Sequence, residues 1–183
     1  MAALSAPRND RRSRKLVVLA HCILNQNARL DGCACYPGAI PQVVELLVAR
    51  GYGLLQLPCP EMAVSDWRRS RRTKEQPFIR QFLEQPEGRA CCRALAEGIA
   101  TQVRDYCDNG FLVAAVIGKD RSPACGVSAT SWDGTFVPGS GVFIEELRAA
   151  LATRGVTVPI VGMADDSEEE VADCIRWLQA NLK

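Results

Sequence analysis

The sequence predicts an α/β protein: a single domain with a mostly parallel four-stranded sheet and helices on both faces, arranged as a Rossmann-like three-layer sandwich. Short apolar runs alternate with segments of helical periodicity, which is the pattern of parallel strands joined by crossover helices. A glycine stands between a helical segment and the next apolar run three times, at Gly51, Gly110 and Gly155, where it would end the helix. A length of 183 residues with 48% hydrophobic residues suffices for one core.

The elements follow in order behind a short tail. Residues 1–14 are polar and basic without periodicity, so we expect a disordered tail there and one domain over residues 15–183. Apolar runs predict strands at 16–20, 53–57, 111–117 and 156–161. Helical periodicity predicts helices at 39–50 and 142–154, and two more within 74–108 with a break near Pro86. Ser167 and Glu170 form a capping box for a last helix, and residues 118–139 are expected to be a loop.

The charge balance limits the partners. Lys and Arg number 22 and Asp and Glu 21, which gives a formal net charge of +1 and makes nucleic acid an unlikely partner. The basic run Arg68–Lys74 is expected to be a solvated loop, with an anionic ligand or RNA as the alternative. No apolar run approaches the roughly 20 residues of a membrane-spanning helix, so we expect no membrane partner. The oligomeric state stays open.

The chain holds nine cysteines, an odd number that leaves one over after full pairing. Residues 15–24 resemble a signal peptide, but His21 precedes Cys22 where a lipoprotein site needs a small residue, and no cleavage pattern follows. We therefore interpret this segment as a buried strand and expect a cytoplasmic protein, whose thiols stay reduced and serve metals or catalysis more often than disulfides.

Three cysteines follow three predicted strands. Cys22 comes after the first strand, Cys59 after the second and Cys125 after the third. Ligands of open α/β sheets bind beyond the carboxyl ends of the strands, so these thiols are expected to meet although 37 and 66 residues separate them. A structural zinc site takes four ligands, commonly as Cys-x-x-Cys pairs, and those pairs are missing. A cubane iron–sulfur cluster with one iron open to substrate suits three cysteines.

The remaining cysteines have simpler interpretations. Buried cysteines often only pack, and we expect this of the four in helical segments, Cys91, Cys92, Cys107 and Cys174. Cys33 and Cys35 are either ligands of a different metal site or a redox pair, or they are incidental. His21 is the single histidine, which excludes a His-rich metal site. Its side chain should point away from Cys22 if the first strand continues.

Several polar residues accompany the three thiols. Glu61 lies two residues after Cys59 and could relay protons or activate water. Ser122 lies three residues before Cys125 and could hold that water or donate to a developing charge. The structural alternatives are a helix-start carboxylate for Glu61 and a turn residue for Ser122. The candidates for binding a polar substrate, with loop capping as their alternative, are Asn25, Asn27, Arg29 and Asp31.

Three short motifs mark these strand ends. They are Cys22 with Arg29-Leu30-Asp31-Gly32, then Cys59-Pro60-Glu61, then Ser122-Pro123-Ala124-Cys125-Gly126. In this order, over roughly residues 16–127, they resemble the 2-thiouracil desulfurase (TudS) family, and the chain resembles a related branch of desulfidases.

The resemblance implies a [4Fe-4S] cluster held by Cys22, Cys59 and Cys125, with one open iron for the substrate sulfur. It implies Glu61 as the catalytic carboxylate and Ser122 as the catalytic serine. The implied reaction replaces the thiocarbonyl sulfur of a small molecule, such as a thiolated nucleobase, by water, and releases hydrosulfide without net redox change. Iron–sulfur assembly machinery would be a partner.

The sequence departs from the family pattern at Ile23 and Asn25 of Cys22-Ile23-Leu24-Asn25, at Leu30, and over Met62-Ala63-Val64-Ser65-Asp66-Trp67. These positions are expected to contact substrate rather than cluster, so the thiolated substrate stays open. Two other functions also stay open. One is a cluster or zinc protein without catalysis, in which Glu61 and Ser122 are dispensable. The other is a protein that acts on thiolated RNA, whose binding would weaken steeply with salt.

Overall fold

The computed structural model describes residues 10–64 and 79–182. Four parallel strands form the central sheet in the order β2-β1-β3-β6. Their bounds are β1 (Lys15–Leu19), β2 (Gly53–Gln56), β3 (Leu112–Lys119) and β6 (Ile160–Met163). All four strands therefore present their carboxyl ends at one edge of the sheet, as the predicted α/β class requires.

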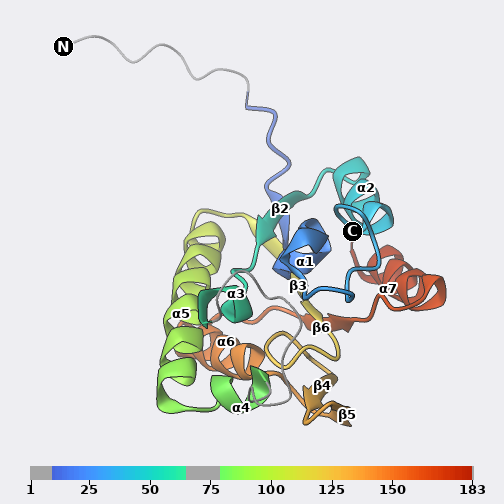
Figure 1. Cartoon of the computed structure of the whole chain (residues 1–183). Helices are drawn as coiled ribbons and strands as arrows, with labels where there is room; N and C mark the ends of the chain where they lie inside the picture. Colours follow the sequence, from blue (N-terminus) through green and yellow to red (C-terminus); the bar gives the residue numbers. More distant parts are fainter. Residues whose placement is uncertain (1–9, 65–78, 183) are drawn as a thin grey trace.

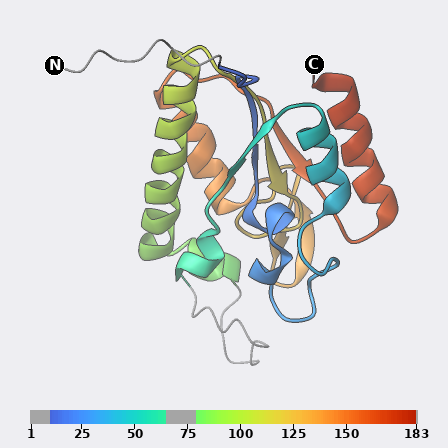
Figure 2. The same ribbon diagram turned by 90° about the horizontal axis from the view of Figure 1, so that it is seen from above.

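The helices lie in two layers around this sheet (Figure 1 and Figure 2). On one face lie α5 (Pro86–Asp108) and α6 (Val142–Thr153), and on the other lie α2 (Pro41–Ala49) and α7 (Glu168–Asn181). The short helices are α1 (His21–Leu24), the 3-10 turn η1 (Gln26–Ala28), α3 (Pro60–Val64) and α4 (Ile79–Leu83). The observed architecture is a single-domain three-layer α/β sandwich, which confirms the predicted fold class.

The core explains why the central strands are continuous apolar runs. Val17, Val18 and Leu19 of β1 are fully buried, because helices cover both faces of the strand. Phe143 of α6 and Leu47 of α2 are fully buried as well, one in each helical layer. Apolar side chains on two sides of β1 therefore join the layers into one hydrophobic core.

The predicted helix ends are also present. Gly51, Gly110 and Gly155 all have positive φ, at 76°, 76° and 65°, a conformation that costs glycine little because it has no Cβ. The Ser167 hydroxyl accepts a hydrogen bond from the Glu170 amide at 3.3 Å and caps α7. The break near Pro86 separates α4 from α5.

Three expectations need correction. The fourth strand begins at Ile160 rather than at residue 156, following Pro159, which lacks the N–H that a ladder needs. The chain does not continue as a strand after β1, because α1 begins at His21. Residues 118–139 are not all loop: β3 runs to Lys119, and β4 (Ala129–Trp132) and β5 (Thr135–Pro138) form a hairpin.

Two sequence predictions fall partly or wholly outside the described residues. The basic run Arg68–Lys74 lies outside them, as does most of the basic tail. Residues 10–14, at the end of that tail, are exposed and have no regular secondary structure. Within the described ranges, none of the helices has the length and apolar character needed to cross a membrane.

The close packing around Gly126 predicts that a larger residue there lowers the stability of the protein. A Cβ at Gly126 would lie 2.2 Å from the carbonyl oxygen of Ala129, so Gly126→Ala is expected to destabilise the protein by about 1–3 kcal/mol. At Gly98, an exposed position of α5, a Cβ meets no atom within 4 Å, so Gly98→Ala is expected to stabilise by about 0.5–1 kcal/mol. Urea unfolding measures the free energy of unfolding of both variants. A change in the same direction for both substitutions would contradict this packing.

Candidate functional site

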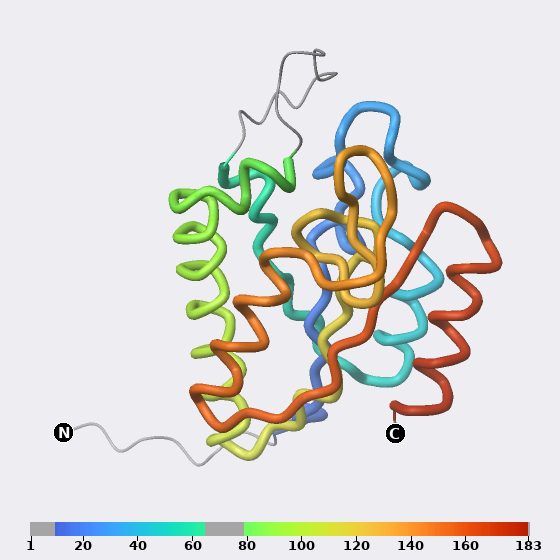
Figure 3. Tube along the Cα trace, turned by 90° about the horizontal axis from the view of Figure 1, so that it is seen from below, coloured from blue at the N-terminus to red at the C-terminus, as the bar shows by residue number. Residues whose placement is uncertain are grey.

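A cavity of about 670 Å³ opens at the carboxyl ends of the strands. Cys22 of α1, Cys59 before α3 and Cys125 in the loop after β3 all line it. Figure 3 shows the segments that surround this edge: the loop that follows η1, helices α3 and α4, and the β4–β5 hairpin lie at the same end of the molecule. The structure thus brings together the three cysteines that the strand ends predicted to meet.

The spacing of the three thiols bears on the kind of metal group they could hold. Two sulfur ligands of one tetrahedral zinc ion lie about 3.8 Å apart, given Zn–S bonds of about 2.3 Å. In the described part of the chain, the thiols of Cys22, Cys59 and Cys125 do not all lie within 4.8 Å of one another. Cysteines that bind different irons of one cluster stand farther apart than ligands of a single ion. Three thiols are the donor set that a cluster with one open iron requires.

Burial opposes the ionisation of two of these thiols, Cys22 and Cys125. It raises the pKa of Cys22 to about 12, although Arg29 and Lys119 act in the opposite direction. Burial also raises the pKa of Cys125 well above its ordinary value, and the nearby Cys22 and Cys59 thiols raise it further. Cys22 and Cys125 are then protonated thiols at neutral pH and poor nucleophiles. A metal would displace their protons, so this environment suits ligands rather than catalytic thiols.

The loop that holds Cys125 is fixed by its own hydrogen bonds. The Ser122 hydroxyl accepts from the backbone amides of Ala124 at 3.2 Å and Cys125 at 3.0 Å. The Cys125 carbonyl accepts from the amide of Lys119 at 2.9 Å. Gly141 lies so close that a Cβ there would stand 2.3 Å from the carbonyl oxygen of Ala124. The Cys125 side chain therefore has a defined place in the cavity wall.

Glu61 and Ser122, predicted as a catalytic pair, are in direct contact. Ser122 Oγ donates to Glu61 Oε1 at 3.0 Å, and both residues line the cavity. Two backbone amides already occupy the acceptor side of the hydroxyl, so its single proton is directed to the carboxylate. Glu61 also lies in the first turn of α3, where a negative charge is favoured. The pair presents an oriented carboxylate beside the three thiols.

Only one of the four predicted substrate-binding residues lines the cavity. Arg29 lines the cavity, whereas Asn25, Asn27 and Asp31 are not among the residues that line it. The Asn25 side chain accepts from the Asn27 amide at 3.1 Å and caps η1, which is the structural alternative. Asp31 is exposed in the turn that follows.

His21 lies where the sequence did not place it. The expectation that its side chain points away from the site is wrong, because α1 begins at His21 and its ring lines the cavity. Its Nδ1 is 3.2 Å from Gln56 Nε2.

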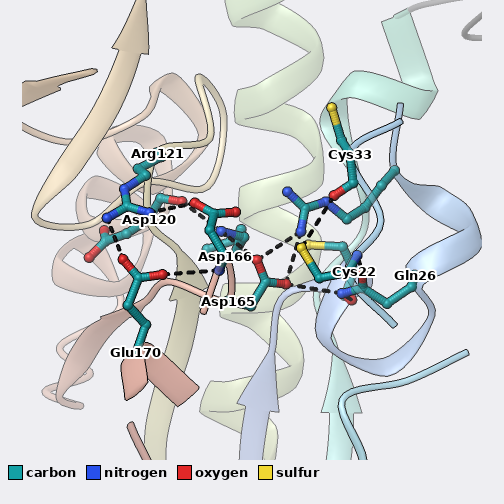
Figure 4. A network of polar contacts seen from close by, with 11 residues as sticks. Cys22, Gln26, Cys33, Asp120, Arg121, Asp165, Asp166 and Glu170 are labelled. Carbon is teal, nitrogen blue, oxygen red and sulfur yellow. Dashed lines mark hydrogen bonds and ion pairs between the residues drawn. The ribbon is translucent and has the colours of Figure 1, made fainter. Parts of the chain in front are cut away.

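A buried ionic network is the main feature that the sequence analysis missed. Asp165 follows β6 and has a fully buried side chain, which accepts from Lys119 at 2.9 Å and Arg29 at 2.8 Å. Burial opposes ionisation of Asp165, but the two cations outweigh it and lower its pKa. Figure 4 shows Asp165 and Asp166 between Cys22 and Gln26 on one side and Arg121 and Glu170 on the other. The signal in the sequence was a lysine within the last residues of an apolar strand and an acidic pair after the next strand.

The other cysteines lie partly as expected. None of the nine, all within the described ranges, forms a disulfide. Cys92 and Cys174 are buried and Cys91 is half-buried, but Cys107 is exposed, so the packing prediction is wrong for that residue. It lies near the end of α5.

Cys33 and Cys35 are exposed and line the cavity. Cys35, Asp165 and Asp166 offer three ligand atoms within 4.8 Å of one another. Asp165 already binds two cations there, so an ion bound to it would compete with Lys119 and Arg29.

Comparisons with known proteins give two similarities. No family model matches the chain. The protein MJ0003 of Methanocaldococcus jannaschii, described as uncharacterized, is 31% identical over 116 residues, which are 63% of this chain and 70% of that protein. A solved structure described as a [4Fe-4S]-dependent thiouracil desulfidase, TudS, is 20% identical, with a TM-score of 0.49 over 89% of this chain and 99% of that one.

Proposed function

We propose that this chain, which belongs to the same protein family as MJ0003, removes sulfur hydrolytically from a small thiocarbonyl compound by means of a [4Fe-4S] cluster. One observation supports this most strongly. Three strand ends deliver Cys22, Cys59 and Cys125 to one cavity that also contains the hydrogen-bonded pair of Glu61 and Ser122. The motifs that resemble the TudS family are the same residues.

The three cysteines that line the cavity are suitable ligands for such a cluster. Cys22, Cys59 and Cys125 would hold it, and iron–sulfur assembly proteins would supply it. When bound, the cluster would supply a Lewis-acidic iron with an open position for sulfur. Residues 15–183 would form a single cluster-binding catalytic domain, since the cysteines, the carboxylate and the serine lie on one sheet edge.

Glu61 and Ser122 divide the proton chemistry in this proposal. Water attacks the thiocarbonyl carbon, and the Glu61 carboxylate accepts a proton from that water. Ser122 donates to Glu61 Oε1 at 3.0 Å and so fixes the orientation of the carboxylate, which lines the cavity. A C–O bond forms and the C–S bond breaks, which gives a carbonyl product and hydrosulfide. Carbon keeps its oxidation state, so the reaction needs no external oxidant or reductant.

Arg29 is the predicted substrate residue that reaches the cavity. Its guanidinium can donate hydrogen bonds to a polar ring substituent while it stays paired with Asp165. Roles for Asn25, Asn27 and Asp31 would require a substrate that extends past the cavity rim. The departures from the family motif at Ile23 and Leu30 leave the thiolated compound itself to experiment.

Release of hydrosulfide tests this function. The anaerobically reconstituted protein is incubated with 2-thiouracil, with other thiolated bases and with a thiolated RNA, and hydrosulfide and carbonyl product are measured. We expect equimolar hydrosulfide and oxygen-containing product from at least one small thiolated base. A protein that binds iron but releases no hydrosulfide would be a cluster protein without this activity, and release from the RNA alone would favour the RNA function.

A further inference from the structure

Two cations share one buried carboxylate at the carboxyl ends of the strands. Lys119 at the end of β3 and Arg29 after η1 both bind Asp165, with Nζ–Oδ1 and Nη1–Oδ1 distances of 2.9 Å and 2.8 Å. The side chains of Asp165, Lys119 and Arg29 are 0%, 5% and 16% exposed. We call these three residues the buried charge group; Figure 4 shows Asp165 at its centre.

The buried charge group has a formal net charge of +1, because two cations face one carboxylate. The two other arginines that line the cavity each face two carboxylates: Arg121 binds Asp166 and Glu170, and Arg80 binds Glu84 and Glu145. A surplus charge is costly to bury unless an opposite charge compensates it. The Asp166 carboxylate, which is bound to Arg121, lies within 4.8 Å of the Asp165 carboxylate, and an anion on the cysteine side of the cavity would be a second compensating charge.

The cysteine side of the cavity is where that anion would lie. Gln26 Nε2 donates to the Cys22 carbonyl at 2.8 Å and to Asp165 Oδ2 at 3.1 Å, so it joins the two residues directly. Cys22, Arg29 and Lys119 also line the same cavity. The two cations therefore face the space that a group bound to Cys22 would occupy.

We propose that Lys119 and Arg29, fixed in place by Asp165, compensate the negative charge of the cysteine-bound cluster and raise its reduction potential. This inference rests on the proposed function, since it requires the cluster at Cys22. Three thiolates make the site anionic, and reduction adds a further negative charge. Nearby positive charge stabilises the reduced form more than the oxidised form. Asp165 is a positioning residue, because it acts through the two cations that it binds.

The reduction potential of the reconstituted protein tests the proposal. In an anaerobic titration with dithionite, Lys119→Met is expected to lower the midpoint potential. The ratio of reduced to oxidised cluster at a fixed potential should fall about tenfold, which corresponds to ~59 mV for one electron. Asp165→Asn keeps both cations and removes the carboxylate, so it is expected to shift the potential in the opposite direction. Lys119→Arg keeps the charge and should stay near the wild type.

The matched control removes a positive charge elsewhere. Arg104 binds Asp108 in an exposed pair near the end of α5, at the opposite edge of the sheet, and Arg104→Met should leave the potential unchanged. If Lys119→Met does not fold or loses iron, Arg29→Met takes its place, because it also removes one positive charge, from a more exposed side chain. Its midpoint potential is likewise expected to fall. Potentials that do not move, or that move together in Lys119→Met and Asp165→Asn, would overturn the proposal. A wild type that binds no iron would instead overturn the proposed function.

Discussion

Glu61→Gln is expected to lower the rate of hydrosulfide release by about 10²–10⁴-fold, the range that a general acid–base group contributes, with the iron content unchanged. Glutamine keeps the size and the acceptor oxygen that Ser122 Oγ contacts at 3.0 Å, but its amide cannot take a proton from water. The measurement is kcat for hydrosulfide release, with iron determined on the same samples. A variant with full activity would remove Glu61 from the mechanism.

Ser122 offers a matched comparison. Ser122→Thr keeps the hydroxyl and should retain most of the activity, whereas Ser122→Ala should lose activity because Glu61 is no longer oriented. The alanine variant also leaves the amides of Ala124 and Cys125 without their acceptor, at a cost of about 1–3 kcal/mol for each group that stays buried. Its stability therefore has to be measured beside its activity. Equal activity of the two variants would show that the hydroxyl has no role.

Cys22→Ser, Cys59→Ser and Cys125→Ser are each expected to abolish stable cluster binding. A serine hydroxyl is a harder and more weakly acidic donor than a thiol, and iron–sulfur clusters prefer thiolate ligands. One iron of the cluster has no cysteine ligand even in the wild type. With only two cysteines left, a second iron would lose its ligand, and the cluster would be held by too few bonds. Iron and acid-labile sulfide per chain measure the loss.

The chain supplies close controls for these substitutions. Cys33 and Cys35 line the same cavity but are exposed, and Cys107 lies outside it on α5. Serine variants of these three residues are expected to bind as much iron as the wild type. If Cys33→Ser or Cys35→Ser loses iron while Cys59→Ser retains it, the metal ligands are Cys33 and Cys35 rather than Cys59.

The sheet and its helical layers could be predicted because their signals are local. Each parallel strand is buried on both faces and so appears as a short apolar run, and Gly51, Gly110 and Gly155 mark helix ends through a positive φ. The meeting of Cys22, Cys59 and Cys125 in one cavity followed from one general property of the fold: the carboxyl ends of parallel strands share an edge.

What escaped prediction depends on contacts between distant segments or on short local signals. The hairpin of β4 and β5 turns at Asp133-Gly134, both with positive φ, which is a known hairpin dipeptide in a segment too short to show clear alternation. The binding of Lys119 and Arg29 to Asp165 joins residues 46 and 136 positions apart. No periodicity indicates such a pairing, because each charged residue is ordinary in its own segment.

The ratio of iron and sulfide to protein tests most directly the central claim that Cys22, Cys59 and Cys125 hold one multi-iron cluster. We predict about four irons and four sulfides per chain in the anaerobically reconstituted wild type, and none retained in the three serine variants. A single metal ion per chain without sulfide, no iron at all, or iron that survives all three substitutions would contradict the account.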